Sequence, residues 1–180
     1  MLAYAGLVEN SFPSVNSLRE RSSELMELGR WTEVVDLLKG TPESTSDFEI
    51  AWNAGWAHFK LDDIGAAREI LSRAVSLSPD NHAGHLALGL TLYGAGELKI
   101  AERHLRTALE LRDTTTARLA LALTYMQLGR NNDAENIHLE GISKQPNAPD
   151  RWAAYADFLS DCGRREDAAD AYAKAKALMP

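Results

Sequence analysis

Small and apolar residues recur along this chain with a period close to 34 residues. The clearest markers are four aligned glycines, which are Gly29, Gly96, Gly129 and Gly163. Five positions after them comes a series of small residues, Val34, Ala101, Ala134 and Ala168, with Ala67 in the same series. Each period also holds two stretches with the apolar spacing of an amphipathic helix. A fixed period in this range is typical of stacked helical hairpins, so we predict an all-α array.

We expect five units after an N-terminal extension of residues 1–14. The units are residues 15–47, 48–81, 82–114, 115–148 and 149–180, and each is predicted to be two helices joined by a short turn. From the second unit onward the predicted helix pairs are 47–61 and 64–77, 82–95 and 98–111, 115–128 and 131–144, and 150–162 and 165–179. The loop-like stretch 40–46 shortens the second helix of the first unit. Three residues are predicted to cap helix N-termini: Asp80, Asp113 and Asn147.

The fifth unit carries the fullest version of the repeated pattern. Its residues are Trp152, Tyr155, Ala156, Leu159, Gly163, Ala168, Tyr172, Ala175 and Pro180. At these positions the chain resembles the tetratricopeptide repeat family over nearly everything after residue 14. The resemblance implies a right-handed α-solenoid whose first helix in each repeat lines a concave face. The second unit departs from the family pattern by placing Asp62 where glycine is usual.

Composition narrows the class of protein further. The 180 residues carry a formal net charge of −7 without a Lys/Arg cluster, which argues against nucleic-acid binding. The single cysteine, Cys162, cannot form an internal disulfide and favours a reducing compartment. No apolar run could span a bilayer, and residues 1–8 lack the basic start of a signal peptide. We therefore expect a cytoplasmic protein.

Candidate catalytic or metal-binding chemistry is sparse in the sequence. Neither a glycine-rich phosphate loop nor a Gly-x-Ser-x-Gly motif is present. His82 and His85 lie three residues apart and could form half of a metal site, but no further ligand is evident nearby. His58 and His138 occupy core positions of the repeat and are expected to pack there. We expect no enzymatic activity, no metal and no cofactor.

The family resemblance implies where a partner would bind. In this family, peptides contact set positions of the first helix of each repeat, and the best-known use is a clamp on a C-terminal carboxylate. No register of this chain supplies the paired cations that such a clamp needs. The corresponding positions are mostly apolar, with i, i+4, i+7 spacing in three successive units. The expected groove residues are Trp52, Asn53, Trp56, Phe59, Leu86, Leu90, Tyr93, Leu119, Leu123 and Met126.

This pattern is typical of two situations. The apolar residues can pack against the neighbouring repeats, or they can hold a partner in a polar-rimmed groove. The hypothesis drawn from it is a protein-interaction module that binds an apolar or amphipathic segment, with helix-in-groove geometry. The chain's own residues 2–8, or another copy in a homodimer, are candidate occupants. Alternatives are a regulatory or targeting module of a larger enzyme and a self-assembling scaffold.

Overall fold

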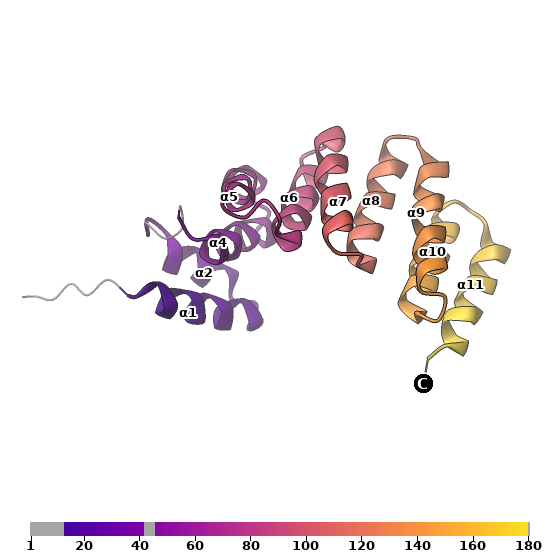
Figure 1. The fold of residues 1–180 in the computed structure, drawn as a ribbon, viewed down its shortest axis with the longest axis horizontal. Coiled ribbons are helices and arrows are strands. Elements are labelled where there is room, and N and C mark those ends of the chain that lie inside the picture. The colour runs from indigo at the N-terminus through magenta and orange to yellow at the C-terminus, as the bar shows by residue number, and fades with distance from the viewer. Residues whose placement is uncertain (1–12, 42–45, 180) are drawn as a thin grey trace, which may run out of the picture.

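The computed structural model describes residues 13–41 and 46–179, and these ranges contain ten α-helices and no strand. The helices are α1 (Val15–Glu27), α2 (Trp31–Leu38), α4 (Phe48–Lys60), α5 (Ile64–Leu77), α6 (His82–Gly94), α7 (Leu98–Leu111), α8 (Thr115–Gln127), α9 (Asn131–Lys144), α10 (Pro149–Asp161) and α11 (Arg165–Ala177). They pair into five consecutive hairpins, so the predicted all-α fold is confirmed (Figure 1).

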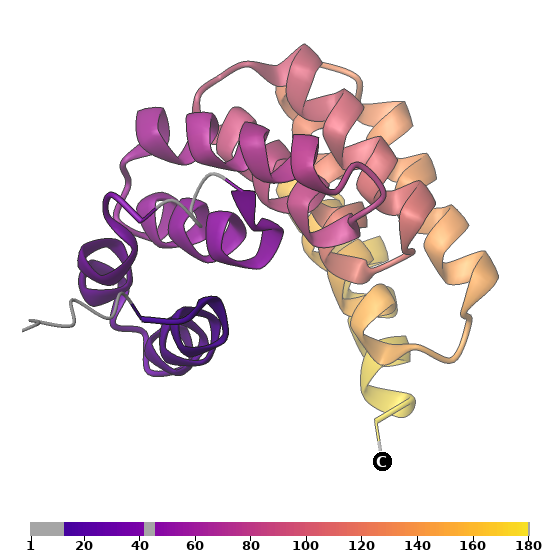
Figure 2. The same cartoon turned by 60° about the vertical axis from the view of Figure 1, so that its left-hand side comes forward.

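The hairpins stack side by side into a curved array (Figure 2). The first helices of successive hairpins contact one another, in the order α1, α4, α6, α8 and α10. Within the described chain, the second helices of neighbouring hairpins make no comparable contact. Because the first helices are the closer set, they form the inner, concave side. The second helices α2, α5, α7, α9 and α11 form the outer, convex side.

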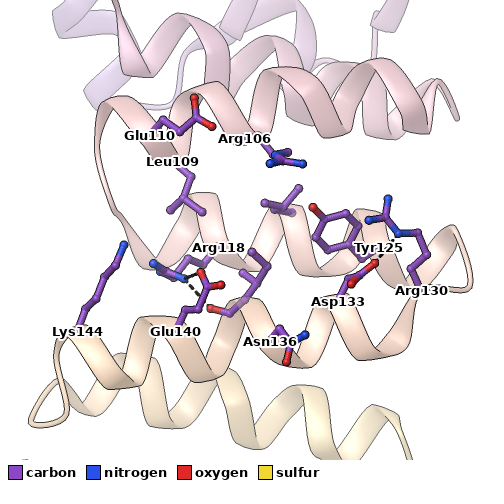
Figure 3. Close-up of a pocket in the computed structure, with 12 residues that line it drawn as sticks. Arg106, Leu109, Glu110, Arg118, Tyr125, Arg130, Asp133, Asn136, Glu140 and Lys144 are labelled. Atoms are coloured by element: carbon purple, nitrogen blue, oxygen red, sulfur yellow. Dashed lines mark hydrogen bonds and ion pairs between the residues drawn. The ribbon is translucent and has the colours of Figure 1, made fainter.

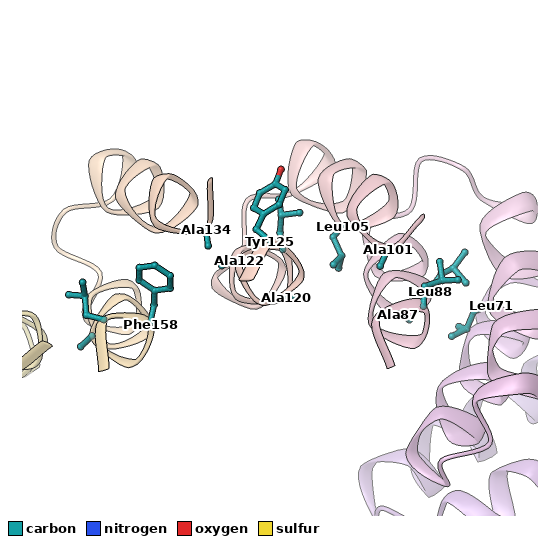
Figure 4. Close-up of a cluster of buried hydrophobic side chains, with 14 of the residues drawn as sticks. Leu71, Ala87, Leu88, Ala101, Leu105, Ala120, Ala122, Tyr125, Ala134 and Phe158 are labelled. Atoms are coloured by element: carbon teal, nitrogen blue, oxygen red, sulfur yellow. The ribbon is translucent and has the colours of Figure 1, made fainter. Parts of the chain in front are cut away.

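Close approach of the two helices in a hairpin depends on small residues. Gly55 on α4 lies against Leu71 on α5, and Gly89 on α6 lies in the same way against Leu105 on α7. A Cβ atom at either glycine would sit only 2.6–2.7 Å from the leucine Cγ. The alanines of the repeat are equally buried, and they share one continuous core with both leucines (Figure 4). Hydrophobic burial and packing against these small residues therefore hold each pair together.

The first hairpin differs from the others. Its second helix, α2, has eight residues, whereas α5, α7 and α9 have fourteen. Its buried residues form a separate apolar cluster around Leu18, Leu25, Val34 and Leu38, to which α4 also contributes. A shortened second helix was expected here, whereas residues 42–45 of the expected loop 40–46 lie outside the described residues. Atypical terminal repeats are common in such arrays.

Tight turns within the hairpins use the left-handed backbone region. Gly29, Gly96, Gly129 and Gly163 have φ between 68° and 76°. Asp62 occupies the equivalent turn of the second hairpin with φ of 62°, which makes it the one non-glycine residue with positive φ in the described ranges. Glycine enters this region without steric cost, whereas other residues are strained there.

Replacing Asp62 with glycine is expected to raise the free energy of unfolding by about 0.5–1 kcal/mol, because the strain at this turn is relieved. Urea unfolding followed by circular dichroism measures the change. Gly96→Asp is the matched reverse substitution in the next hairpin and should destabilise. A destabilised Asp62→Gly protein would contradict this account.

The helix caps correct the sequence interpretation. Asn81 and Thr114 cap α6 and α8 through their side chains, one residue later than predicted, and Ala148 precedes α10 without a side-chain cap. The prediction of Asp80, Asp113 and Asn147 as caps was therefore wrong. Proline at the first position of α10 lacks one of the N–H groups that a helix start leaves unpaired, and its fixed φ suits that position. Asp113 instead serves the polar junction described below.

Candidate functional site

Nine of the expected groove residues lie on the three inner helices α4, α6 and α8 and define what we call the concave apolar surface. Its members are Trp52, Trp56, Phe59, Leu86, Leu90, Tyr93, Leu119, Leu123 and Met126. Eight of these side chains are half-buried, and Leu119 is 38% exposed. Most of them pack against the edge of the main core. Neighbouring repeats therefore cover this surface in part and leave the remainder open to solvent.

The two tryptophans are held in a defined arrangement. The rings of Trp52 and Trp56 are stacked, with centroids 5.9 Å apart and an interplanar angle of 5°. The ring centroid of Phe59 lies 5.0 Å from that of Trp56. The indole N–H of Trp52 donates to the carbonyl oxygen of Ala83 on α6, at 3.1 Å. Tyr93 on α6 is similarly fixed, because its hydroxyl accepts from the Gln127 side chain at 3.1 Å. These contacts preorganise the aromatic part of the surface.

Asn53 does not belong to this surface. Its side chain is 3% exposed, and its amide donates to the hydroxyl oxygen of Ser22 on α1, at 2.8 Å. The side chain therefore joins the first two inner helices and is not accessible to a partner. The position looked exposed in the repeat pattern, but the buried polar hydroxyl on α1 requires a partner.

Acidic side chains border the concave apolar surface on α10. Asp150, Asp157 and Asp161 are exposed and follow the helical spacing of one face. Asp150 accepts a hydrogen bond from the Thr115 hydroxyl of α8, at 2.5 Å, and Asp157 accepts one from Tyr172 of α11. These neutral partners leave the negative charge of both carboxylates uncompensated.

The histidines form a pair that sequence reasoning missed. His85 on α6 and His104 on α7 approach through their Nδ1 atoms, 3.0 Å apart, and the other ring nitrogen of His85 contacts the Pro79 carbonyl oxygen at 2.9 Å. Burial and the neighbouring His85 lower the pKa of His104. His82 instead contacts the carbonyl oxygen of Ala108. In the part of the chain that the structure describes, no group of three or more metal-ligating side chains is found.

A polar junction joins the fourth and fifth hairpins, and its centre is Asp113 in the loop between α7 and α8. Arg118 of α8 donates to both carboxylate oxygens, at 2.8 and 2.7 Å, and Arg151 of α10 donates to one of them at 3.1 Å. Lys144 of α9 completes the set at 3.2 Å. The hydrogen bonds from Arg118, outweighing partial burial, hold the pKa of Asp113 well below its usual range. The two arginines are only 3% and 4% exposed.

The arginines reach into the space between the last hairpins because residue 141 is glycine. Arg118 donates to the carbonyl oxygen of Ile137 at 2.6 Å, and Arg151 donates to that of Gly141 at 3.1 Å. A Cβ atom at Gly141 would lie 2.8 Å from Arg118 and 2.9 Å from Arg151. Helices α8 and α9 consequently pack less closely than the pairs of the second, third and fifth hairpins.

This looser packing opens a cleft on the convex side, between α7 and α9 and above α8 (Figure 3). The cleft has a volume of about 420 Å³ and an apolar floor that includes Leu121 and Tyr125. Its rim carries charges of both signs. Arg130 stacks over the Tyr125 ring at 4.4 Å and pairs with Asp133 at 2.6 Å. Because cations and carboxylates alternate, the rim favours neither an anionic nor a cationic ligand.

His138 on α9 lies beside the polar junction, 4% exposed and packed against Tyr155 and Phe158. Burial, reinforced by the positive charge of Arg118, lowers its pKa to about 4 from 6.5. Its Nε2 atom is buried and has no hydrogen-bond partner among the residues that the structure describes. The second and third hairpins place an apolar leucine, Leu71 and Leu105, at the equivalent position.

Replacing His138 with leucine is expected to stabilise the protein at pH 7 by about 1 kcal/mol or more, since an unpartnered buried polar atom is removed. The advantage should grow by up to about 3 kcal/mol as the pH falls from 6.5 to 4. The folded-state pKa is below the unfolded value, so the unfolded chain binds the extra proton and acid destabilises the parent. Urea unfolding of both proteins at several pH values tests this, and a constant difference would contradict it.

Comparison with known proteins agrees with this architecture. A curved stack of helical hairpins with an apolar inner face defines a helical-repeat protein, a class that binds other proteins through extended concave surfaces. Two sequence-family models, both described as tetratricopeptide repeat, match this chain. One matches residues 48–81, which contain the second hairpin, and the other matches residues 117–149, which cover most of the fourth. The chain is a tetratricopeptide-repeat protein, and its fold is that of a protein-interaction module.

Several solved structures of MamA share the fold. MamA AMB-1, in its P212121 crystal form, aligns with a TM-score of 0.70 at 25% identity, over 89% of this chain and 96% of that chain. MamA MSR-1 gives a TM-score of 0.68 at 25% identity, over 89% and 94%. A further MamA structure gives a TM-score of 0.70 at 19% identity, over 87% and 93%. No curated protein sequence matches the chain.

The helices that the structure describes lie within residues 13–41 and 46–179. None of these helices combines the length and apolar character that crossing a bilayer requires. The N-terminal segment 2–8, a candidate occupant of the concave apolar surface, lies outside the described residues.

Proposed function

We propose that this protein is a non-catalytic adaptor that binds an apolar or amphipathic segment of another protein on its concave apolar surface. The observation that carries the proposal is the run of half-buried aromatic and aliphatic side chains over α4, α6 and α8. Tryptophan and tyrosine supply much of the binding energy at protein interfaces, and here they are fixed before a partner arrives. Polar residues on α1 and α10 border the run at both ends.

A helical partner segment fits this surface best. Each inner helix contributes apolar residues at i, i+4 and i+7, so the surface is a set of parallel ridges rather than one long slot. A helix lying across these ridges can bury an apolar stripe and satisfy its own backbone hydrogen bonds. An extended strand would lack edge partners here, because the described chain offers only helices.

The decisive experiment uses a double substitution, Trp56→Glu with Leu90→Glu. It should abolish capture of the native partner, identified by affinity purification and confirmed with the purified protein, while helicity stays unchanged. Leu111→Glu with Leu139→Glu is the matched control, because these exposed leucines lie on the outer helices α7 and α9. Unchanged partner affinity in the Trp56/Leu90 variant, with a normal circular dichroism spectrum, would contradict the proposal.

A further inference from the structure

The charges beside the concave apolar surface restrict the chemistry of its partner. On α6, α8 and α10 the inward-facing repeat positions carry no lysine or arginine at all. The charged residues at these positions are Asp150, Asp157 and Asp161, all on α10 and all exposed. Because α10 contacts α8 and is the next inner helix, the acidic face follows the apolar residues Leu123 and Met126 along the concave side. An apolar ligand that extends beyond α8 necessarily meets this negative charge.

Two of the three arginines closest in sequence to this face are engaged elsewhere, and the third, Arg165 on the outer helix α11, forms no ion pair with the three carboxylates. Arg151 is buried in the polar junction, and Arg164 pairs with Glu135 and Asp167 at 2.6 and 2.7 Å. The Asp161 carboxylate makes no ion pair or hydrogen bond with the described residues, and those of Asp150 and Asp157 accept hydrogen bonds only from hydroxyl groups. No cation of the described chain forms an ion pair with these three carboxylates, so a ligand with positive charge can supply that partner.

We infer that the partner segment is a basic amphipathic helix whose Lys/Arg-rich end lies over α10. This inference rests on the proposed binding at the concave apolar surface and adds the charge and the length of the ligand. Neighbouring packed helices have axes about 8–10 Å apart, so the run from α4 to α8 spans about 20 Å. At 1.5 Å per residue, about 13 residues of apolar stripe cover it, and the basic residues follow within about two further turns.

The test compares two synthetic peptides of about 20 residues with the same apolar stripe. One carries three lysines at the end that follows the stripe, and the other carries three glutamates there. Isothermal titration calorimetry with the full chain should give at least tenfold tighter binding of the lysine peptide in dilute buffer. The preference should shrink in 0.5 M salt, because exposed charges are screened over a few ångströms at such concentrations.

Matched protein variants locate the effect. Asp157→Asn with Asp161→Asn should weaken the lysine peptide about tenfold and leave the glutamate peptide unchanged or bound more tightly. The control is Glu166→Gln with Asp170→Asn, which removes the same charge from exposed positions of α11. A control variant that loses as much affinity would show that only net charge matters and would overturn the inference.

The peptides also separate this inference from the proposed function. If both peptides bind equally well, and Trp56→Glu with Leu90→Glu abolishes both, then the apolar surface binds ligands but the charge inference is wrong. If neither peptide binds the parent protein, then both the inference and the proposed docking surface fail. Preference for the lysine peptide that is lost on α10 substitution supports the inference.

Discussion

Replacing Asp113 with asparagine is expected to lower the free energy of unfolding by about 3–5 kcal/mol, because two buried guanidinium groups lose their counter-ion. Arg118 and Arg151 are almost fully buried, and Asp113 accepts hydrogen bonds from both. Asparagine keeps the size of the side chain but removes its charge and one acceptor oxygen. Chemical unfolding followed by circular dichroism measures the loss.

Asp133→Asn is the control for this substitution. Asp133 pairs with Arg130 at 2.6 Å, but both side chains are more than 40% exposed, so its loss should cost at most about 1 kcal/mol. Equal effects of the two substitutions would mean that the polar junction behaves like a surface ion pair. A loss below about 1 kcal/mol for Asp113→Asn would contradict the importance assigned to burial.

The junction also predicts where the array first opens. Because it couples the loop before α8 to α9 and α10, its failure should release the fifth hairpin before the second and third unfold. Stability in repeat arrays is approximately a sum of repeat and nearest-neighbour terms, so a weakened interface acts locally. Hydrogen exchange of Asp113→Asn should therefore accelerate in α10 and α11 more than in α4–α7.

Much of the fold could be predicted from the sequence because its cause is repeated in the sequence. Glycine recurs where the backbone requires positive φ, and small residues recur where two helices touch. Asp62 departs from the glycine pattern, and its φ of 62° shows that the backbone of the turn is retained despite the change of residue. Such local steric requirements are visible in the spacing of glycines and small residues, so they can be predicted from a single sequence.

The polar contacts could not be predicted in the same way. Asp113 precedes α8 and therefore resembles a helix cap, but Thr114 occupies the capping position and leaves the carboxylate free to meet Arg118 of α8 and Arg151 of α10. The position of Asn53 in the repeat suggests an accessible side chain, but its amide donates a hydrogen bond to the Ser22 hydroxyl. The contacts of Asp113 with Arg151 and of Asn53 with Ser22 join separate hairpins, and the spacing within one repeat contains no information on them. Gly141 was the available signal, since it left room for the buried arginines.

Replacing Gly89 with alanine is expected to destabilise the protein by about 1–3 kcal/mol, although alanine is the better helix former. The added Cβ would lie 2.7 Å from Leu105 Cγ and 3.3 Å from the backbone nitrogen of the same residue. Leu105 is fully buried, so it cannot move aside without disturbing the core. Gly65→Ala, where a Cβ meets nothing closer than 4.0 Å, should instead be neutral or stabilising by up to about 1 kcal/mol.

A double-mutant cycle distinguishes steric overlap from a general intolerance of residue 89. Leu105→Ala alone should cost about 2–5 kcal/mol, because it leaves a cavity in the core. In the combined variant the new methyl group enters that cavity, so the double mutant should be at least about 1 kcal/mol more stable than additivity predicts. Strictly additive effects in urea unfolding would mean that contact between Gly89 and Leu105 does not set the spacing of α6 and α7.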